Sequence, residues 1–173
     1  RSLLRDDGRP RSDDPALTTR LAYVVTGDAQ ADEAARLGLA GLTRVLRERT
    51  ALDAGDPKAV DPARDDLTFY PLLYWPVVAS RPQPPQAARD ALALFMKNGG
   101  TVVFDTRDAL TKREGAQSPE AAWLKRLLQG VDVPELEPVP ADHVVTKTFY
   151  LVQGFPGRTA NGETWIEALP PAP

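Results

Sequence analysis

Three polar residues follow the apolar run 101–104 (TVVF) and could form an active site: Asp105, Arg107 and Asp108. Two carboxylates beside an arginine could orient a polar ligand, hold a hard cation such as Mg²⁺, or act as general acid and base. Open α/β sheets bind ligands just beyond the carboxyl ends of their strands, and these residues would lie there. The same residues could equally cap the next element and pair with one another, and we favour this structural interpretation.

The only imidazole of the chain is that of His143, which follows Asp142 between a proline-rich and an apolar segment. An adjacent carboxylate could orient the ring, although neighbours on a strand point to opposite faces. We expect His143 to have a structural, hydrogen-bonded role, because buried polar groups are normally satisfied by partners. The alternative is a hydrolase-like or carbohydrate-related site in which His143 joins Asp105 and Asp108, with or without a divalent cation.

An aromatic segment at residues 69–75 (FYPLLYW) ends in Trp75, which would project toward the same sheet edge as Asp105. A large aromatic side chain at that edge could contact a ligand. Core packing is the default for the aromatic set as a whole, which comprises Phe69, Tyr70, Tyr74, Trp75, Phe149 and Tyr150. The candidate ligand-binding residues are therefore Trp75, Asp105, Arg107 and His143.

Composition excludes several chemistries. The chain has no cysteine, which removes disulfides, thiolate nucleophiles and sulfur metal sites. Residues 26–29 (TGDA), after the first expected strand, match neither the G-x-G-x-x-G nor the P-loop pattern, so no nucleotide cofactor is predicted. Lys plus Arg number 21 against 24 Asp plus Glu, so the net charge of −3 does not favour a nucleic-acid partner. We predict no cofactor and no metal site.

Strand and helix signals alternate between residues 20 and 130. This order predicts an α/β domain with a mostly parallel sheet built from right-handed βαβ units. The expected strands are 20–26, a short one near 59–60, one after Pro71 and 101–104, with late strands at 144–152 and 164–169. The expected helices are 29–49, 84–97 and 119–129. Residues 131–141 are expected to be extended.

The helix signals also predict caps and buried faces. Asp28 and Ser118 are expected N-caps, and the glycine pair 99–100 is expected to end the second helix. The expected apolar stripes are Ala35, Leu39, Leu42 and Leu46 in the first helix, Ala88, Ala91, Leu92, Phe95 and Met96 in the second, and Ala122, Leu124, Leu127 and Leu128 in the third. Gly38 and Gly41 lie beside the first stripe, and we expect them to let that helix approach the sheet closely.

The expected domain organisation is a flexible leader or linker at 1–18, a single α/β domain at 19–169 and a tail at 170–173. The leader is charged and contains two prolines without any period. No apolar run approaches the roughly 20 residues that cross a bilayer, so we expect no membrane insertion by this segment. Because the chain starts at Arg1 without methionine, we expect an excised or processed domain whose anchor lies outside it.

Three motifs in order carry a family resemblance: residues 69–75 (FYPLLYW), 97–105 (KNGGTVVFD) and 138–143 (PVPADH) followed by 148–150 (TFY). Over about residues 21–157 the chain resembles the bacterial domain-of-unknown-function family 4159. That family is similar to the class I glutamine amidotransferase-like superfamily, which implies a flavodoxin-like, three-layer α/β sandwich. Its members often form the C-terminal part of membrane proteins with an aerotolerance-type double-transmembrane N-terminal region. The resemblance thus implies attachment to a bacterial cell membrane through segments outside this chain.

The chain departs from the family pattern at its presumed site. Asp105 and His143 match family positions, but Trp75-Pro76 stands where many members have Gly-His, and Asp105-Thr106 where they have Asp-Asp. The amidotransferase nucleophile is a cysteine, so this chain cannot perform that reaction. The family pattern continues past Pro173, which implies that a further element lies beyond it. We therefore expect a non-catalytic binding or protein-interaction module with a degenerate site. Its expected partners are other domains of the same membrane protein or members of its complex. A small-molecule ligand stays open.

Overall fold

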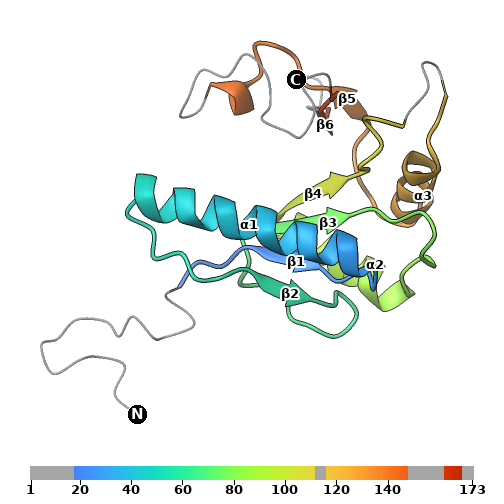
Figure 1. Cartoon of the computed structure of the whole chain (residues 1–173). Coiled ribbons are helices and arrows are strands. Elements are labelled where there is room, and N and C mark those ends of the chain that lie inside the picture. The colour runs from blue at the N-terminus through green and yellow to red at the C-terminus, as the bar shows by residue number, and fades with distance from the viewer. Residues whose placement is uncertain (1–17, 112–115, 148–161, 169–173) are drawn as a thin grey trace, which may run out of the picture.

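The computed structural model describes residues 18–111, 116–147 and 162–168. At its centre is a four-stranded sheet of order β2-β1-β3-β4 in which all neighbours are parallel (Figure 1). The strands are β1 (Ala22–Val24), β2 (Lys58–Val60), β3 (Leu72–Pro76) and β4 (Thr101–Asp105), and the helices are α1 (Ala29–Arg49), α2 (Gln86–Lys97) and α3 (Pro119–Leu128). A 3₁₀ turn, η1 (Val144–Thr146), and an antiparallel pair, β5 (Leu136–Pro138) with β6 (Trp165–Glu167), follow.

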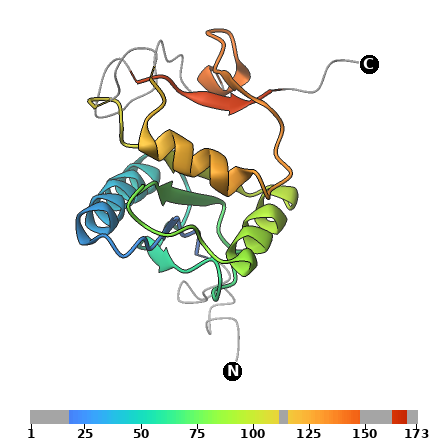
Figure 2. The same cartoon turned by 90° about the vertical axis from the view of Figure 1, so that its right-hand side faces the viewer.

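The helices cover both faces of the sheet, with α1 on one side and α2 on the other (Figure 2). Alternate residues of a strand point to opposite faces, so β3 directs Leu72 and Tyr74 toward α1 and Leu73 and Trp75 toward α2 and α3. Ala35 of α1 belongs to the buried cluster against which Leu72 and Tyr74 pack. The predicted flavodoxin-like, three-layer α/β sandwich is confirmed.

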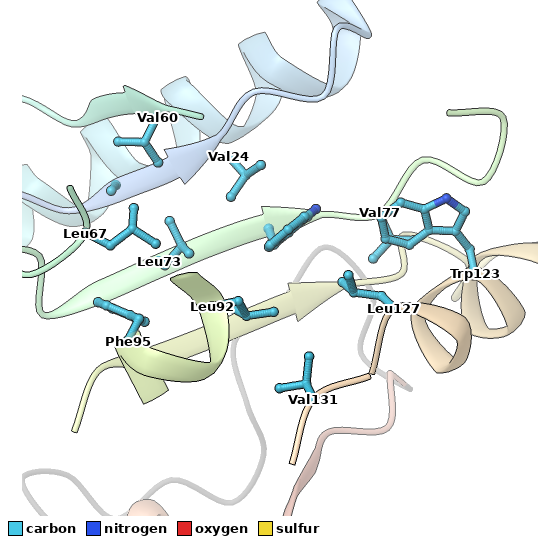
Figure 3. Close-up of a cluster of buried hydrophobic side chains, with 12 residues drawn as sticks. Val24, Val60, Leu67, Leu73, Val77, Leu92, Phe95, Trp123, Leu127 and Val131 are labelled. Atoms are coloured by element: carbon cyan, nitrogen blue, oxygen red, sulfur yellow. The ribbon is translucent and has the colours of Figure 1, made fainter. Parts of the chain in front are cut away.

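The larger core cluster lies between the sheet and the helices α2 and α3 (Figure 3). Leu73, Leu92 and Leu127, from β3, α2 and α3, are fully buried there. Burial of each such side chain stabilises the fold by about 1.5–3 kcal/mol relative to exposure. Trp123 of α3 lies beside Val77, at the end of the cluster where β3 finishes (Figure 3).

The predicted helix ends are confirmed by their hydrogen bonds. Asp28 Oδ1 accepts from the Ala31 amide at 2.8 Å, and Ser118 Oγ accepts from the Ala121 amide at 3.0 Å. Gly99 ends α2 in the left-handed region with φ of 91°. The next glycine has a steric role, because a Cβ at Gly100 would lie 2.4 Å from the Phe95 ring.

Two predicted helix faces are wrong in part. In α1 Leu42 is 41% exposed, whereas Thr43 is 2% exposed and takes the buried position. The buried row follows four-residue steps, which lie along one face of the helix: Ala31, Ala35, Leu39 and Thr43. In α3 the expected stripe omitted Trp123, which is buried.

The expected packing role of two glycines is also wrong. A Cβ at Gly38 or Gly41 would meet no atom within 4 Å, so neither residue mediates a close approach.

Other expectations changed near the ends of the chain. The strand predicted at 144–152 is wrong for residues 144–146, which form η1, while 148–152 lie outside the described residues. The expected extended segment contains the strand β5, and the expected late strand at 164–169 is confirmed as β6. Core packing is wrong for Phe69, which is 74% exposed. The predicted leader, apart from Thr18, and Phe149 and Tyr150 lie outside the described residues.

Candidate functional site

A pocket of about 240 Å³ lies at the carboxyl edge of the sheet, where β1 and β3 end side by side. The chain leaves β1 toward α1 and leaves β3 toward α2, so the two connections diverge to opposite faces (Figure 2). Such a switch point is where open α/β sheets bind ligands. We call this cavity the switch-point pocket. Its apolar lining includes Val24, Trp75, Ala88 and Trp123, and its polar lining includes Thr26, Asp61, Arg81 and Gln83.

One wall of the switch-point pocket is the proline-rich connection between β3 and α2. Trp123 Nε1 donates to the Arg81 carbonyl at 2.8 Å, and Gln83 Nε2 donates to the Trp123 carbonyl at 3.0 Å. Prolines 82, 84 and 85 restrict the backbone between these contacts. The wall is therefore fixed against α3 before any ligand binds.

The connection between β1 and α1 is closed by a carboxylate of the chain itself. Asp32 Oδ1 accepts from the Thr26 amide at 2.8 Å and from the Thr26 hydroxyl at 2.7 Å. Asp32 Oδ2 accepts from the Gly27 amide at 3.1 Å. These amides lie where many α/β folds bind a ligand phosphate at a helix N-terminus. In this chain an internal anion already satisfies them.

Arg81 lies at the rim of the switch-point pocket with its guanidinium over Gly27. Its Cζ, Nη1 and Nη2 atoms lie 3.6–3.7 Å from the position that a Cβ would take at Gly27. Arg81 Nη2 also donates to the Gly27 carbonyl. Gly27 has φ of 79°, which side chains disfavour, so glycine serves both the turn and the approach of the guanidinium.

Asp105, the first predicted site residue, links two strands. Tyr74 Oη donates to Asp105 Oδ2 at 2.5 Å, and the Arg107 amide donates to Asp105 Oδ1 at 2.9 Å. Arg107 has φ of 56°, the left-handed conformation, and is exposed. Asp105 thus fixes the loop that follows β4.

Asp108 is buried and participates in a cap. Its carboxylate accepts from Thr106 Oγ1 at 2.7 Å and from Ser118 Oγ, the hydroxyl that caps α3. These contacts join the loop after β4 to the start of α3. Trp75 lies buried in the pocket lining, with its ring centroid 5.8 Å from that of Phe104.

His143 is half-buried and caps η1. Its Nδ1 accepts from the Val145 amide at 3.2 Å, and its carbonyl accepts from Thr146. In the described ranges no hydrogen bond or ion pair joins any two of Asp105, Asp108 and His143. Across the same ranges, no three His, Asp or Glu residues form a group that could hold a metal ion.

A larger cavity of about 550 Å³ lies at the opposite, amino edge of the sheet. It is lined by the segment that enters β3 and by the end of α2, including Tyr70, Leu94 and Gly100. Burial raises the pKa of Tyr70 above its usual 10.0, and the charge of Asp65 adds to this effect. Parallel sheets bind ligands at the carboxyl edge, so the smaller pocket is the better candidate site.

Sequence reasoning missed Asp32, Arg81, Gln83 and Trp123. Only Trp123 had a usable signal, because it precedes Leu127 by four residues and so shares its helix face. The other residues acquire their roles through folding, since Arg81 and Gly27 are 54 positions apart. In the part of the chain that the structure describes, no helix is long and apolar enough to cross a membrane.

Comparison with known proteins places the chain in a family. Residues 20–169 match the profile of the family described as "Domain of unknown function (DUF4159)". No curated protein matches the chain. Because the match covers most of the 173 residues, the chain belongs to the DUF4159 family.

Proposed function

We propose that this domain is a non-catalytic binding module whose ligand occupies the switch-point pocket. The observation that carries the proposal is the prearranged wall of that pocket. Its backbone is held by Trp123 Nε1 at 2.8 Å and by Gln83 Nε2 at 3.0 Å. A site that is ordered before binding loses less entropy when the ligand arrives.

The contacts of the expected catalytic residues support a binding role over a hydrolytic one. Asp105 and Asp108 accept hydrogen bonds that shape the loop after β4 and the start of α3. The Nδ1 atom of His143 accepts a hydrogen bond from a backbone amide. A histidine that acts as a general base needs this atom either free or oriented by a carboxylate. These side chains stabilise local structure, which supports a binding module whose resemblance to amidotransferases does not extend to their chemistry.

The wider context of the proposal comes from the resemblance described above. We place the domain in a bacterial membrane-anchored protein, with the transmembrane segments outside this chain. Its partners are then other domains of the same protein, and ligand binding at the switch-point pocket would be transmitted to these domains. A pull-down with the transmembrane part of that protein tests this interaction. Failure of the domain to retain the transmembrane part would count against it as a partner.

The pocket itself is tested by a fragment screen monitored by two-dimensional ¹H–¹⁵N NMR. Ligands of the pocket should shift the indole N–H signal of Trp123, because that group borders the site. Val25→Trp should block binding, since Val25 lines the pocket and is 47% exposed. Val45→Trp is the matched control, because Val45 is 46% exposed on α1 and should leave binding unchanged. Binding that survives in Val25→Trp, or no fragment at the pocket, would contradict the proposal.

A further inference from the structure

Among the residues that the structure describes, Arg81 is the only Lys or Arg in the lining of the switch-point pocket. Its guanidinium has five N–H donors, and in the described residues its one side-chain hydrogen bond is to the Gly27 carbonyl. No carboxylate of those residues forms an ion pair with it. Arg81 therefore has donors and positive charge left for a ligand.

Arg81 is held in place by contacts of its backbone and of its side chain. Its amide donates to the Val78 carbonyl at 3.0 Å, and its carbonyl accepts from Trp123 Nε1 at 2.8 Å. Its guanidinium packs over Gly27. A cation held in this way is ready to form a charge-assisted, bidentate hydrogen bond with an anion.

The acidic residues nearby have other partners. Asp61, which also lines the pocket, accepts from the Ala63 amide at 3.0 Å and lies 3.6 Å from Arg64. Asp28 and Asp32 accept from backbone amides at the start of α1. Arg81 thus remains the side chain at this site whose charge lacks a counter-ion in the described ranges.

The β1–α1 loop disfavours a phosphate. The amides of Thr26 and Gly27, which could have bound one, donate to Asp32. A phosphate would have to displace this carboxylate and would be repelled by its charge. A singly charged carboxylate at Arg81 leaves the Asp32 carboxylate in place and is repelled by it less than a phosphate would be.

The floor of the switch-point pocket is apolar. Val24, Trp75, Ala88 and Trp123 are buried beneath the rim that carries Arg81. Resting on the proposed binding function, we infer that the ligand is an apolar carboxylate, with its apolar group on this floor and its carboxylate on Arg81. Either a free carboxylic acid or the C-terminal residue of a peptide has this chemistry.

Matched probes test the inference by NMR titration of the whole chain. The first pair is 4-methylpentanoate and its amide, and the second is N-acetyl-glycyl-leucine with a free or an amidated C-terminus. We expect each acid to bind about tenfold more tightly than its amide, as loss of a charge-assisted contact would produce. Arg81→Gln should remove this preference, whereas Arg44→Gln, an exposed change on α1, should preserve it. The pair that binds more tightly identifies the source of the carboxylate.

The outcomes separate this inference from the proposed function. Equal binding of acids and amides at the pocket would overturn the role of Arg81 but leave a binding pocket. Binding of no probe or fragment at Trp123 would overturn both. Tighter binding of inorganic phosphate than of 4-methylpentanoate at Gly27 would overturn the inferred exclusion of phosphate. The Trp123 indole signal of Arg81→Gln without ligand verifies that this variant is folded.

Discussion

The Tyr74 hydroxyl donates a hydrogen bond of 2.5 Å to the carboxylate of Asp105, although the strand register pairs Asp105 with Pro76. The bond therefore runs diagonally across the sheet between β3 and β4. The other carboxylate oxygen accepts from the amide of Arg107, whose φ is 56°. One side chain thus couples the pairing of two strands to the conformation of the loop that follows them.

Replacing Tyr74 by Phe should lower the free energy of unfolding by about 1 kcal/mol, because it removes a charge-assisted but partly exposed hydrogen bond. Urea denaturation measures this loss. Tyr23→Phe is the matched control, because Tyr23 pairs with Tyr74 in the sheet and its hydroxyl has no hydrogen bond within the described residues. Equal losses in the two variants would show that the bond to Asp105 contributes nothing.

Neutralising the buried carboxylate of Asp108 should destabilise the protein. Asp108→Asn weakens the bonds from Thr106 and Ser118, with an expected loss of about 1–3 kcal/mol in unfolding free energy. Asp132→Asn, at an exposed position, should change stability by less than about 0.5 kcal/mol. Thermal and urea unfolding check both values. A catalytic role would predict little change or a gain in stability on neutralisation, and that result would favour the hydrolase alternative.

Replacing either of two glycines of α1 by alanine should stabilise the protein. Gly38→Ala and Gly41→Ala should each raise the free energy of unfolding by about 0.5–1 kcal/mol, because alanine has the higher helix propensity and meets no atom there. Gly99→Ala should have the opposite sign, because φ at Gly99 is 91°. The melting temperatures of the three variants test these expectations. A lower melting temperature in both Gly38→Ala and Gly41→Ala would contradict the open space found around these positions.

Stability should fall at alkaline pH through Tyr70. Its pKa is raised in the folded state by burial, and then by Asp65, so folding favours the neutral phenol. This contribution is complete below the unfolded pKa of about 10 and is lost as pH rises through the higher folded pKa. Tyr70→Phe should flatten the decline in unfolding free energy above that pH. If the unfolding free energy of Tyr70→Phe declines with pH as steeply as that of the wild type, other groups cause the effect.

The layers of the fold could be predicted from the sequence because their signals are local. Strand composition, helix periodicity and the caps at Asp28 and Ser118 depend on residues a few positions apart. The best-supported pocket could not be predicted in this way. Trp123 donates a hydrogen bond to Arg81, 42 positions earlier in the chain, and no sequence pattern in either segment predicts this contact.

The predicted site residues illustrate the same limit. Asp105 does lie at the carboxyl end of β4, as the strand pattern indicated. The partner of its carboxylate is Tyr74, 31 positions earlier, and only the register of β3 against β4 brings them together. The sequence could place the aspartate at the ligand edge, but it could not tell a satisfied carboxylate from one that awaits a ligand.

The central position of β1 has a kinetic consequence. β1 has three residues and pairs with strands that begin at Lys58 and Leu72, whereas β3 and β4 share five register pairs within residues 72–105. The shorter loop closure of the β3–α2–β4 unit favours its early formation. We expect Leu92→Ala to slow folding and Val24→Ala mainly to speed unfolding in stopped-flow experiments, and the reverse pattern would refute this order. Transient opening would then release β1 first and, with it, the loop on which Arg81 rests.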